Sequence, residues 1–130
     1  MKPQVILNLF GGMEAGRVAC ERAGIPIKNY LSSEIDPYAI KIAKKNFPDI
    51  IQLGDVREVL KFWYHNNFPK VDLLMGGSPC QGFSFAGKQL NFDDPRSKLF
   101  FKFVDVLDKL KPKYFLLENV RMKKESQDVI

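Results

Sequence analysis

The stretch VILNLFGGMEAG, residues 5–16, sets the pattern that the rest of the chain repeats. Its first half, residues 5–10, is mostly apolar and predicts a buried strand, and the glycines that follow predict a tight turn. Four residues then recur at helical spacing, which predicts a helix over residues 13–23 that Gly24 ends. The residues at that spacing are Ala15, Val18, Ala19 and Arg22. The opening unit is therefore strand, turn and helix.

The same alternation continues along the chain. Further strands are predicted at residues 27–33, 50–53, 71–77 and 114–120, and further helices at residues 37–46, 56–64 and 97–110. Asp36 is expected to cap the second helix, which opens on Pro37, a favoured first position. Strands alternating with helices predict an α/β, Rossmann-like fold with one parallel sheet, in which ligands bind at the carboxyl ends of the strands.

The composition is that of an ordinary globular protein, with 45% hydrophobic and 27% charged residues in a chain of 130. The formal net charge of +5 suits a polyanionic partner without requiring one. No apolar run approaches the ~20 residues that a membrane span needs. Residues 1–12, MKPQVILNLFGG, lack the cleavage site of a signal peptide. We therefore expect a cytosolic protein that does not contact a membrane.

The two cysteines are expected to be reduced thiols, because a chain without a secretion signal rarely holds a disulfide. Cys20 lies in the helical stretch RVACERA and is interpreted as a packing residue. Cys80 follows Pro79 in a long loop, which by itself is more typical of a structural cysteine than of a catalytic one. No metal site is expected, because there is no CxxC pair and His65, the single histidine, has no neighbours that could be ligands.

Small and acidic residues gather where the first three predicted strands end. Gly11, Gly12 and Gly16 would let a ligand approach the backbone, but they form no GxGxxG and no Walker lysine follows, so a phosphate cradle is not predicted. Glu34 follows the second strand, where a carboxylate can bind both hydroxyls of a ribose. Asp55 follows the third, where it can accept an adenine amino group or cap the next helix. Together they indicate a pocket for an adenosine without a phosphate; a plain turn and solvated carboxylates at helix starts are the alternatives.

The loop after the fourth strand connects these clusters to a known family. GGSPCQGFSFAGKQLNFDDPRSKLFF, from Gly76 onward, and the later ENV strongly resemble the DNA cytosine-5 methyltransferases. The resemblance runs from Val5 to Val120 and includes LFGG, SEID, GDV, the Pro-Cys-Gln loop and Glu-Asn-Val. It is closest to the de novo-type and phage branches, although Gly11 departs from the more usual Asp or Ala. The resemblance implies a Rossmann-like fold that uses S-adenosyl-L-methionine and releases S-adenosyl-L-homocysteine.

The resemblance implies catalytic roles for four residues. The thiolate of Cys80 would add to C6 of a flipped-out cytosine, which makes C5 able to attack the sulfonium methyl. Glu118 would contact N3 and the exocyclic amine, stabilising the charge pushed onto the ring. Asn119 would hold the loop geometry, and Pro79 would orient the base.

The resemblance also implies binding residues for the cofactor and for DNA. Phe10 would stack on the adenine, Glu34 would bind the ribose, and Asp55 with Val56 would contact the adenine edge. The implied cofactor residues are Phe10, Gly11, Gly12, Met13, Glu34, Ile35, Asp55, Val56 and Leu99. Residues 81–94 are expected to close over DNA as a lid. The implied DNA contacts are Gln81, Ser84, Lys88, Arg96 and Lys98.

The predicted domain is incomplete. The fifth strand is followed by RMKKESQDVI without a closing helix, so we expect an uncovered sheet edge and exposed apolar surface. Members of the family continue with an arginine motif, a target-recognition region and a last cofactor motif. Residues 1–130 are therefore interpreted as a partial methyltransferase catalytic domain, truncated after the fifth strand and without a target-recognition region.

Two other functions stay open. The first is a non-catalytic fragment or split-enzyme subunit that binds cofactor, a complementing chain or its own copy through the open sheet edge. The second is a tRNA cytosine-5 methyltransferase, whose loop usually reads Pro-Pro-Cys-Gln-Pro; the Ser-Pro-Cys-Gln-Gly of this chain favours DNA. The expected setting is the cytoplasm of a bacterium or phage host, in restriction-modification, or the nucleus if the source is eukaryotic.

Overall fold

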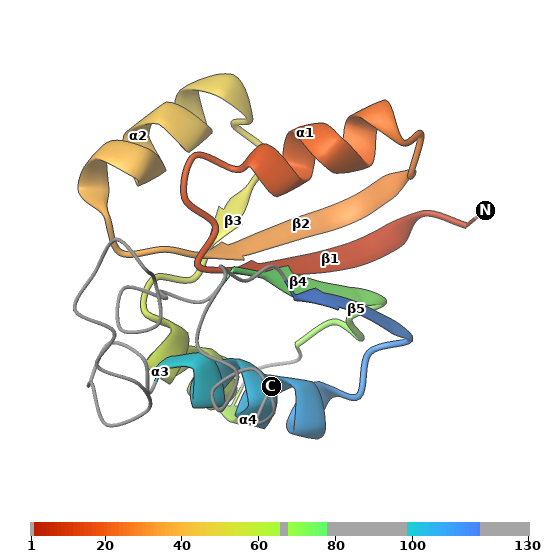
Figure 1. Ribbon diagram of the computed structural model, residues 1–130, viewed down its shortest axis with the longest axis vertical. Coiled ribbons are helices and arrows are strands. Elements are labelled where there is room, and N and C mark those ends of the chain that lie inside the picture. Colours follow the sequence, from red (N-terminus) through yellow and green to blue (C-terminus); the bar gives the residue numbers. More distant parts are fainter. Residues whose placement is uncertain (1, 66–67, 78–98, 118–130) are drawn as a thin grey trace, which may run out of the picture.

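The computed structural model describes residues 2–65, 68–77 and 99–117. Within them, five strands form one parallel sheet in the order β3-β2-β1-β4-β5. Helices α1 and α2 cover one face of the sheet, and α3 and α4 cover the other (Figure 1). The elements are β1 Gln4–Leu9, α1 Ala15–Arg22, β2 Ile27–Ser33, α2 Pro37–Asn46, β3 Ile51–Gln52, α3 Val56–His65, β4 Leu73–Gly76, α4 Leu99–Leu110 and β5 Tyr114–Leu117. The predicted Rossmann-like α/β fold is confirmed.

The element boundaries follow local chemistry. Helix α2 begins at Pro37 as predicted, because the side chain of Asp36 accepts a hydrogen bond from the backbone N–H of Tyr38 at 3.0 Å. Helix α1 begins at Ala15 rather than at residue 13, because Glu14 has φ 69°, a left-handed conformation that an α-helix does not contain. Strand β3 is shorter than predicted, and the expected positions 97–98 and 118–120 lie outside the described residues.

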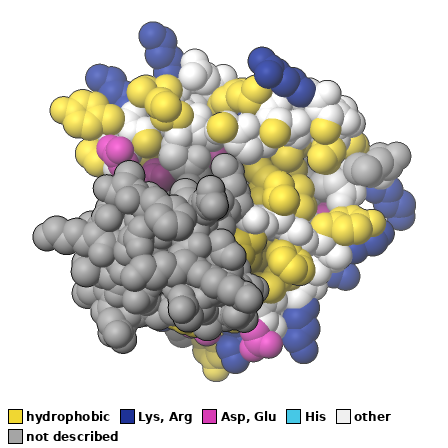
Figure 2. Space-filling view, in the orientation of Figure 1, with side chains coloured by type: hydrophobic (Ala, Val, Ile, Leu, Met, Phe, Trp, Pro, Cys, Tyr) yellow, Lys and Arg dark blue, Asp and Glu magenta, His cyan; other side chains and the backbone are white. Residues whose placement is uncertain are grey.

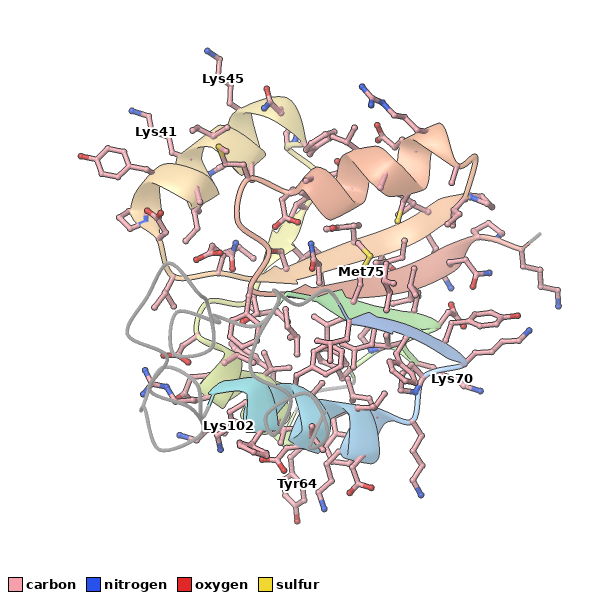
Figure 3. All side chains as sticks on the ribbon, in the orientation of Figure 1. Lys41, Lys45, Tyr64, Lys70, Met75 and Lys102 are labelled. Carbon is pink, nitrogen blue, oxygen red and sulfur yellow. The ribbon has the colours of Figure 1, made fainter. Side chains whose placement is uncertain are left out.

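Two hydrophobic clusters hold the helices on the sheet. The larger cluster, on the side of α3 and α4, consists of Val5, Leu7, Leu9, Leu31, Val56, Val59, Val71, Leu74, Phe103 and Val106. The smaller one lies on the side of α1 and consists of Ile6, Cys20, Tyr30 and Met75. Figure 3 shows Met75 directed from the sheet toward the layer of α1 and α2. Cys20 is 4% exposed, which confirms that it is a packing residue.

The residues whose spacing predicts α1 are not the ones that α1 buries. Ala15, Ala19 and Arg22 are exposed, whereas Arg17 is 8% exposed and lies next to the sheet. Apolar periodicity therefore indicated the helix without indicating its buried face.

Arg17 is accommodated in the interior by charge pairing and by aromatic rings. Its Nε lies 3.0 Å from Glu21 and its Nη2 lies 3.0 Å from Asp49. The guanidinium carbon lies 5.3 Å from the ring centre of Tyr30 and 5.0 Å from that of Phe47. An arginine in this setting packs as well as pairs, and it links α1 to β2 and to the segment after α2.

Strand β5 forms one edge of the described sheet and carries exposed apolar side chains. Tyr114 is 57% exposed, Phe115 59% and Leu116 61%. Figure 2 shows hydrophobic side chains gathered beside the grey region, where Figure 1 places β4 and β5. This confirms the predicted apolar surface over the described residues. No helix in these ranges is long and apolar enough to cross a bilayer.

Candidate functional site

A cavity of about 110 Å³ opens where β1, β2 and β3 end. The residues that line it are Phe10, Ser33, Glu34, Ile35, Gly54, Asp55, Val56 and Arg57. The carboxyl ends of parallel strands are where α/β proteins bind ligands. Five of the nine predicted cofactor residues thus come together at one cavity, Phe10, Glu34, Ile35, Asp55 and Val56.

Phe10 follows directly on β1 in an unusual backbone conformation. Its φ is 57°, a left-handed value that is uncommon for a residue other than glycine. The side chain is half-buried and packs against the larger hydrophobic cluster while also lining the cavity. Strained backbone of this kind concentrates at binding sites, so the conformation supports a functional role for this aromatic ring.

Glu34 connects the end of β2 to the glycine turn after β1. Its Oε1 accepts a hydrogen bond from the N–H of Gly12 at 2.7 Å, and its Oε2 accepts from the N–H groups of Ile35 and Asp36, both at 2.9 Å. Gly12 has φ 59°, which explains the glycine there. A carboxylate has about four acceptor positions, so a ligand diol would share or displace one of these donors.

The turn after β3 is tied into the same arrangement. The Oε1 of Gln52 accepts hydrogen bonds from the N–H of Glu34 at 3.0 Å and of Gly54 at 2.9 Å. The hydroxyl of Ser33 donates to the carbonyl oxygen of Gly54 at 2.7 Å. The turns that end β1, β2 and β3 are therefore held together by hydrogen bonds before any ligand is considered.

Asp55 caps α3, one of the two roles expected of it. Its Oδ1 accepts from the N–H of Arg57 at 2.8 Å, and its Oδ2 lies 2.6 Å from Nη2 of the same arginine. Arg57 lines the cavity and was not among the predicted site residues. A cation in the first turn of a helix opposes the helix dipole, which is the signal that could have identified it. The adenine contact of Asp55 stays a prediction.

The pairing with Arg57 has a measurable consequence for the ionisation of Asp55. The side-chain hydrogen bond from Arg57 lowers the pKa of Asp55 below its ordinary value of 3.8. Because the folded state favours the carboxylate, this pair stabilises the fold above about pH 4 and loses its effect as the pH falls through the lowered pKa. Replacing Arg57 with alanine is expected to return the pKa of Asp55 toward 3.8, measured by NMR titration of its carboxyl carbon.

Lys61→Ala serves as the control for this titration. Lys61 forms an exposed pair with Glu58 on α3, with Nζ 3.1 Å from Oε2, and does not line the cavity. Its removal should leave the pKa of Asp55 unchanged. An Asp55 pKa at or above 3.8 in the unmodified chain would contradict the assignment.

The other four predicted cofactor residues are related to the cavity in different ways. Gly12 reaches it through its hydrogen bond to Glu34, and the N–H of Gly11 donates to the carbonyl oxygen of Ser33 at 3.1 Å. Met13 is 62% exposed and is not among the described residues that line the cavity. Leu99 is the first residue of α4, and the expectation for its side chain stays a prediction.

The predicted catalytic and DNA-binding residues lie outside the described ranges. They are Pro79, Cys80, Gln81, Ser84, Lys88, Arg96, Lys98, Glu118 and Asn119. The strands that lead to them are described: Gly76, the last residue of β4, is the Cα partner of Leu117, the last residue of β5. The segments that carry Cys80 and Glu118 therefore follow the carboxyl ends of two neighbouring parallel strands.

The sequence matches one family model and a set of curated proteins. The model, C-5 cytosine-specific DNA methylase, matches residues 5–128. The Type II methyltransferase M.NlaIV of Neisseria lactamica is 41% identical over 118 residues, which cover 88% of this chain and 27% of the relative. The orphan methyltransferase M.SPRI of Bacillus phage SPR is 40% identical over 118 residues, with 89% and 26% covered. The chain thus spans about a quarter of the length of these relatives.

A similar fold is found among solved structures. The crystal structure of the S. pombe Dnmt2 methyltransferase aligns with a TM-score of 0.68 at 22% sequence identity, covering 97% of this chain and 37% of that one. At this identity the likeness concerns the fold.

Proposed function

The chain belongs to the C-5 cytosine-specific DNA methylase family, and we propose that it carries the cofactor pocket and the nucleophile of an enzyme that methylates C5 of cytosine in DNA. The observation that carries the proposal is the cavity at the ends of β1, β2 and β3, where five predicted cofactor residues meet. The named bacterial and phage relatives support a bacterial or phage setting, in the cytoplasm and within restriction-modification. The two curated relatives named above come from a bacterium and a phage and do not support the nuclear alternative.

The residues at the cavity fit S-adenosyl-L-methionine better than a nucleotide with phosphates. Phe10, Ile35 and Val56 offer apolar surface for an adenine ring, and the carboxylate of Glu34 suits a ribose diol. The guanidinium of Arg57 is engaged by Asp55. A carboxylate beside a paired arginine disfavours a phosphate and favours a ligand with positive charge, such as a sulfonium. When bound, S-adenosyl-L-methionine would supply the methyl group and leave as S-adenosyl-L-homocysteine.

For the chemistry at the base we propose Cys80 as nucleophile and Glu118 as its partner. The thiolate of Cys80 forms a bond to C6 of the cytosine, which makes C5 electron-rich enough to take a methyl group. Glu118 contacts N3 and stabilises the charge that develops on the ring. Loss of the C5 proton to a base then expels the thiolate from C6. The pairing of Gly76 with Leu117 supports this assignment, because the segments that carry Cys80 and Glu118 follow the carboxyl ends of the paired strands β4 and β5.

We further propose that Pro79 and Asn119 shape this part of the site and that the loop after β4 meets the DNA. Gln81, Ser84, Lys88, Arg96 and Lys98 are the proposed DNA contacts, and the formal net charge of +5 is consistent with a polyanionic partner. The names of the curated relatives include Type II and orphan methyltransferases, and the family model names DNA. These names favour DNA over tRNA as the substrate.

A second proposal concerns the exposed edge of the sheet. Tyr114, Phe115 and Leu116 of β5 are each more than half exposed, which is unusual for apolar side chains on a strand of a parallel sheet. We propose that this surface packs against a complementing chain or a second copy of this chain. A monomer at micromolar concentration, measured by analytical ultracentrifugation, would exclude the second copy.

The cofactor proposal is tested by removing Glu34. Replacing Glu34 with alanine is expected to weaken binding of S-adenosyl-L-homocysteine about 10- to 100-fold, because hydrogen bonds to a charged group contribute about 1.5–3 kcal/mol. The measurement is isothermal titration calorimetry with the 130-residue chain. Glu58→Ala is the matched control, since Glu58 lies on α3 outside the cavity lining. Equal affinities of the Glu34 and Glu58 variants would contradict the proposed pocket.

A further inference from the structure

Glu14 is a fully buried acidic residue that the sequence analysis did not single out. It is 0% exposed and lies between the glycine turn and α1 with φ 69°. Its Oε2 accepts hydrogen bonds from Nδ2 of Asn8 and from the hydroxyl of Tyr30, both at 3.0 Å. Its Oε1 accepts from the hydroxyl of Ser32. Acidic side chains are rarely fully buried unless they have partners, and Glu14 has three side-chain partners from β1 and β2.

The partners of Glu14 are set up to donate. Nδ2 of Asn8 also donates to the oxygen of Tyr30 at 3.0 Å, so the phenol is fixed between two groups. Burial, together with the nearby carboxylate of Glu14, raises the pKa of Tyr30 far above its ordinary value, so the phenol keeps its proton. These three side chains and Glu14 form a closed hydrogen-bond network, which we call the Glu14 network.

The Glu14 network explains why residue 11 has no side chain. A Cβ added at Gly11 would overlap the Oε1 of Glu14 and would lie 2.5 Å from the hydroxyl oxygen of Ser32. Gly11 is not among the glycines with positive φ, so its backbone conformation does not require glycine. The constraint is therefore steric, and it comes from Glu14 together with its partner Ser32.

Gly16 allows α1 to bring Glu14 this close to the sheet. A Cβ at Gly16 would lie 2.5 Å from Cε of Met75 and 3.1 Å from Nδ2 of Asn8. The backbone of Glu14 also closes the turn, because its N–H donates to the carbonyl oxygen of Gly11 at 3.0 Å. The next residue of the turn, Gly12, donates to Glu34 of the cavity at 2.7 Å. Glu14 thus holds one end of the turn formed by residues 11–14, and the same turn contacts the predicted cofactor residue Glu34 through Gly12.

We propose that Glu14 is a positioning residue for the cofactor site: its carboxylate, held by Asn8, Tyr30 and Ser32, fixes the glycine turn so that Gly12 meets Glu34 in the geometry that binds ligand. The inference rests on the proposed function, because it takes the turn to be part of the S-adenosyl-L-methionine site. The left-handed backbone of Glu14 is strained for a residue other than glycine, and strain of this kind persists where the surroundings hold it in place.

The test compares Glu14→Ala with Glu14→Gln. Alanine leaves the hydroxyls of Tyr30 and Ser32 without their acceptor and is expected to weaken binding of S-adenosyl-L-homocysteine about tenfold. Glutamine can accept from Asn8 and Tyr30 and donate to Ser32, so it is expected to restore affinity to within about threefold. Glu21→Ala, at the exposed end of the same helix, is the control and should bind within about twofold of the unmodified chain.

Two further measurements keep the inference testable if Glu14→Ala folds poorly. Gly11→Ala retains Glu14 and is expected to weaken ligand binding; its effect should be smaller in the Glu14→Ala background, because one of the two overlapping groups is gone. Additive effects of Gly11→Ala and Glu14→Ala on ligand binding in this double-mutant cycle would contradict the steric conflict between the two positions. Hydrogen exchange of the Gly12 amide reports on the turn without ligand, and it should be faster in Glu14→Ala and restored in Glu14→Gln.

The outcomes separate this inference from the proposed function. If the unmodified chain and Glu14→Ala bind S-adenosyl-L-homocysteine equally well, the positioning role is overturned and the cofactor pocket stands. If the unmodified chain does not bind S-adenosyl-L-homocysteine, the proposed pocket is wrong. Hydrogen exchange of the Gly12 amide then tests the role of Glu14. Faster exchange in Glu14→Ala with rescue by glutamine then supports positioning of the turn, and unchanged exchange overturns it.

Discussion

Replacing Cys80 with serine is expected to abolish the covalent adduct between the chain and DNA that contains 5-fluorocytosine. In the proposed mechanism the thiolate adds to C6, and the adduct breaks down only after a proton leaves C5. Fluorine at C5 cannot leave as a proton does, so the adduct accumulates after methyl transfer. A serine hydroxyl is almost entirely un-ionised at neutral pH, so it cannot replace the thiolate. The adduct is measured by mass spectrometry after incubation with S-adenosyl-L-methionine.

Cys20→Ser is the matched control. Cys20 is 4% exposed in the cluster with Ile6, Tyr30 and Met75, and burial raises the pKa of its thiol, which makes it a poor nucleophile. This variant should lose some stability and still form the adduct. An adduct that persists in Cys80→Ser would overturn the assignment of the nucleophile. Cofactor binding without an adduct in the unmodified chain would instead favour the fragment or split-enzyme interpretation.

Replacing Phe103 with alanine is expected to lower the free energy of unfolding by about 3–5 kcal/mol, the range for a fully buried phenylalanine. Phe103 is 1% exposed on α4, and its Cδ2 would lie 3.3 Å from a Cβ added at Gly76, so its ring packs against the end of β4. Globular domains are stable by only about 5–15 kcal/mol, so this variant loses a large share of its stability. Urea denaturation followed by the fluorescence of Trp63, the single tryptophan, measures the loss.

Phe62→Ala serves as the matched control for Phe103→Ala. Phe62 is 40% exposed on α3, so its truncation leaves a smaller cavity, and we expect a loss of about 1 kcal/mol or less. Similar urea midpoints for the two variants would show that α4 does not hold the sheet as described. A large loss for Phe103→Ala alone would confirm that α4 stabilises the strand from which the Cys80 segment departs.

The parts of the fold that the sequence predicted well are those with a local cause. Asp36 and Pro37 define the start of α2 through one cap and one favoured position, and both are visible in two adjacent letters. The buried run of β2 needs no partner to be recognised, and its predicted limits match those observed. Strand β3 is shorter than its apolar letters suggest, because it pairs with β2 at two positions, Leu31 with Ile51 and Ser32 with Gln52.

The parts that the sequence did not predict depend on distant contacts. Glu14 looks like a surface residue near a helix start, and its burial depends on Tyr30 and Ser32, which come from another strand. Arg17 is buried because rings and carboxylates from other elements surround it. Periodicity counts apolar letters, so it cannot detect polar residues that are buried by pairing. The meeting of five predicted cofactor residues at one cavity was predictable because they lie at or just after the turns that follow β1, β2 and β3, and parallel strands bring these turns together.

Strand β1 lies in the middle of the sheet, between the strands that lead to the two parts of the proposed active site. On one side β1 pairs with β2, which leads to proposed cofactor residues; on the other it pairs with β4, which leads to the proposed nucleophile. Asn8 has Ser32 as its neighbour on the first side and Met75 on the second. We therefore expect substitutions on β2 and β3 to alter cofactor affinity without changing how β4 pairs with β5, because β1 lies between the two pairs of strands.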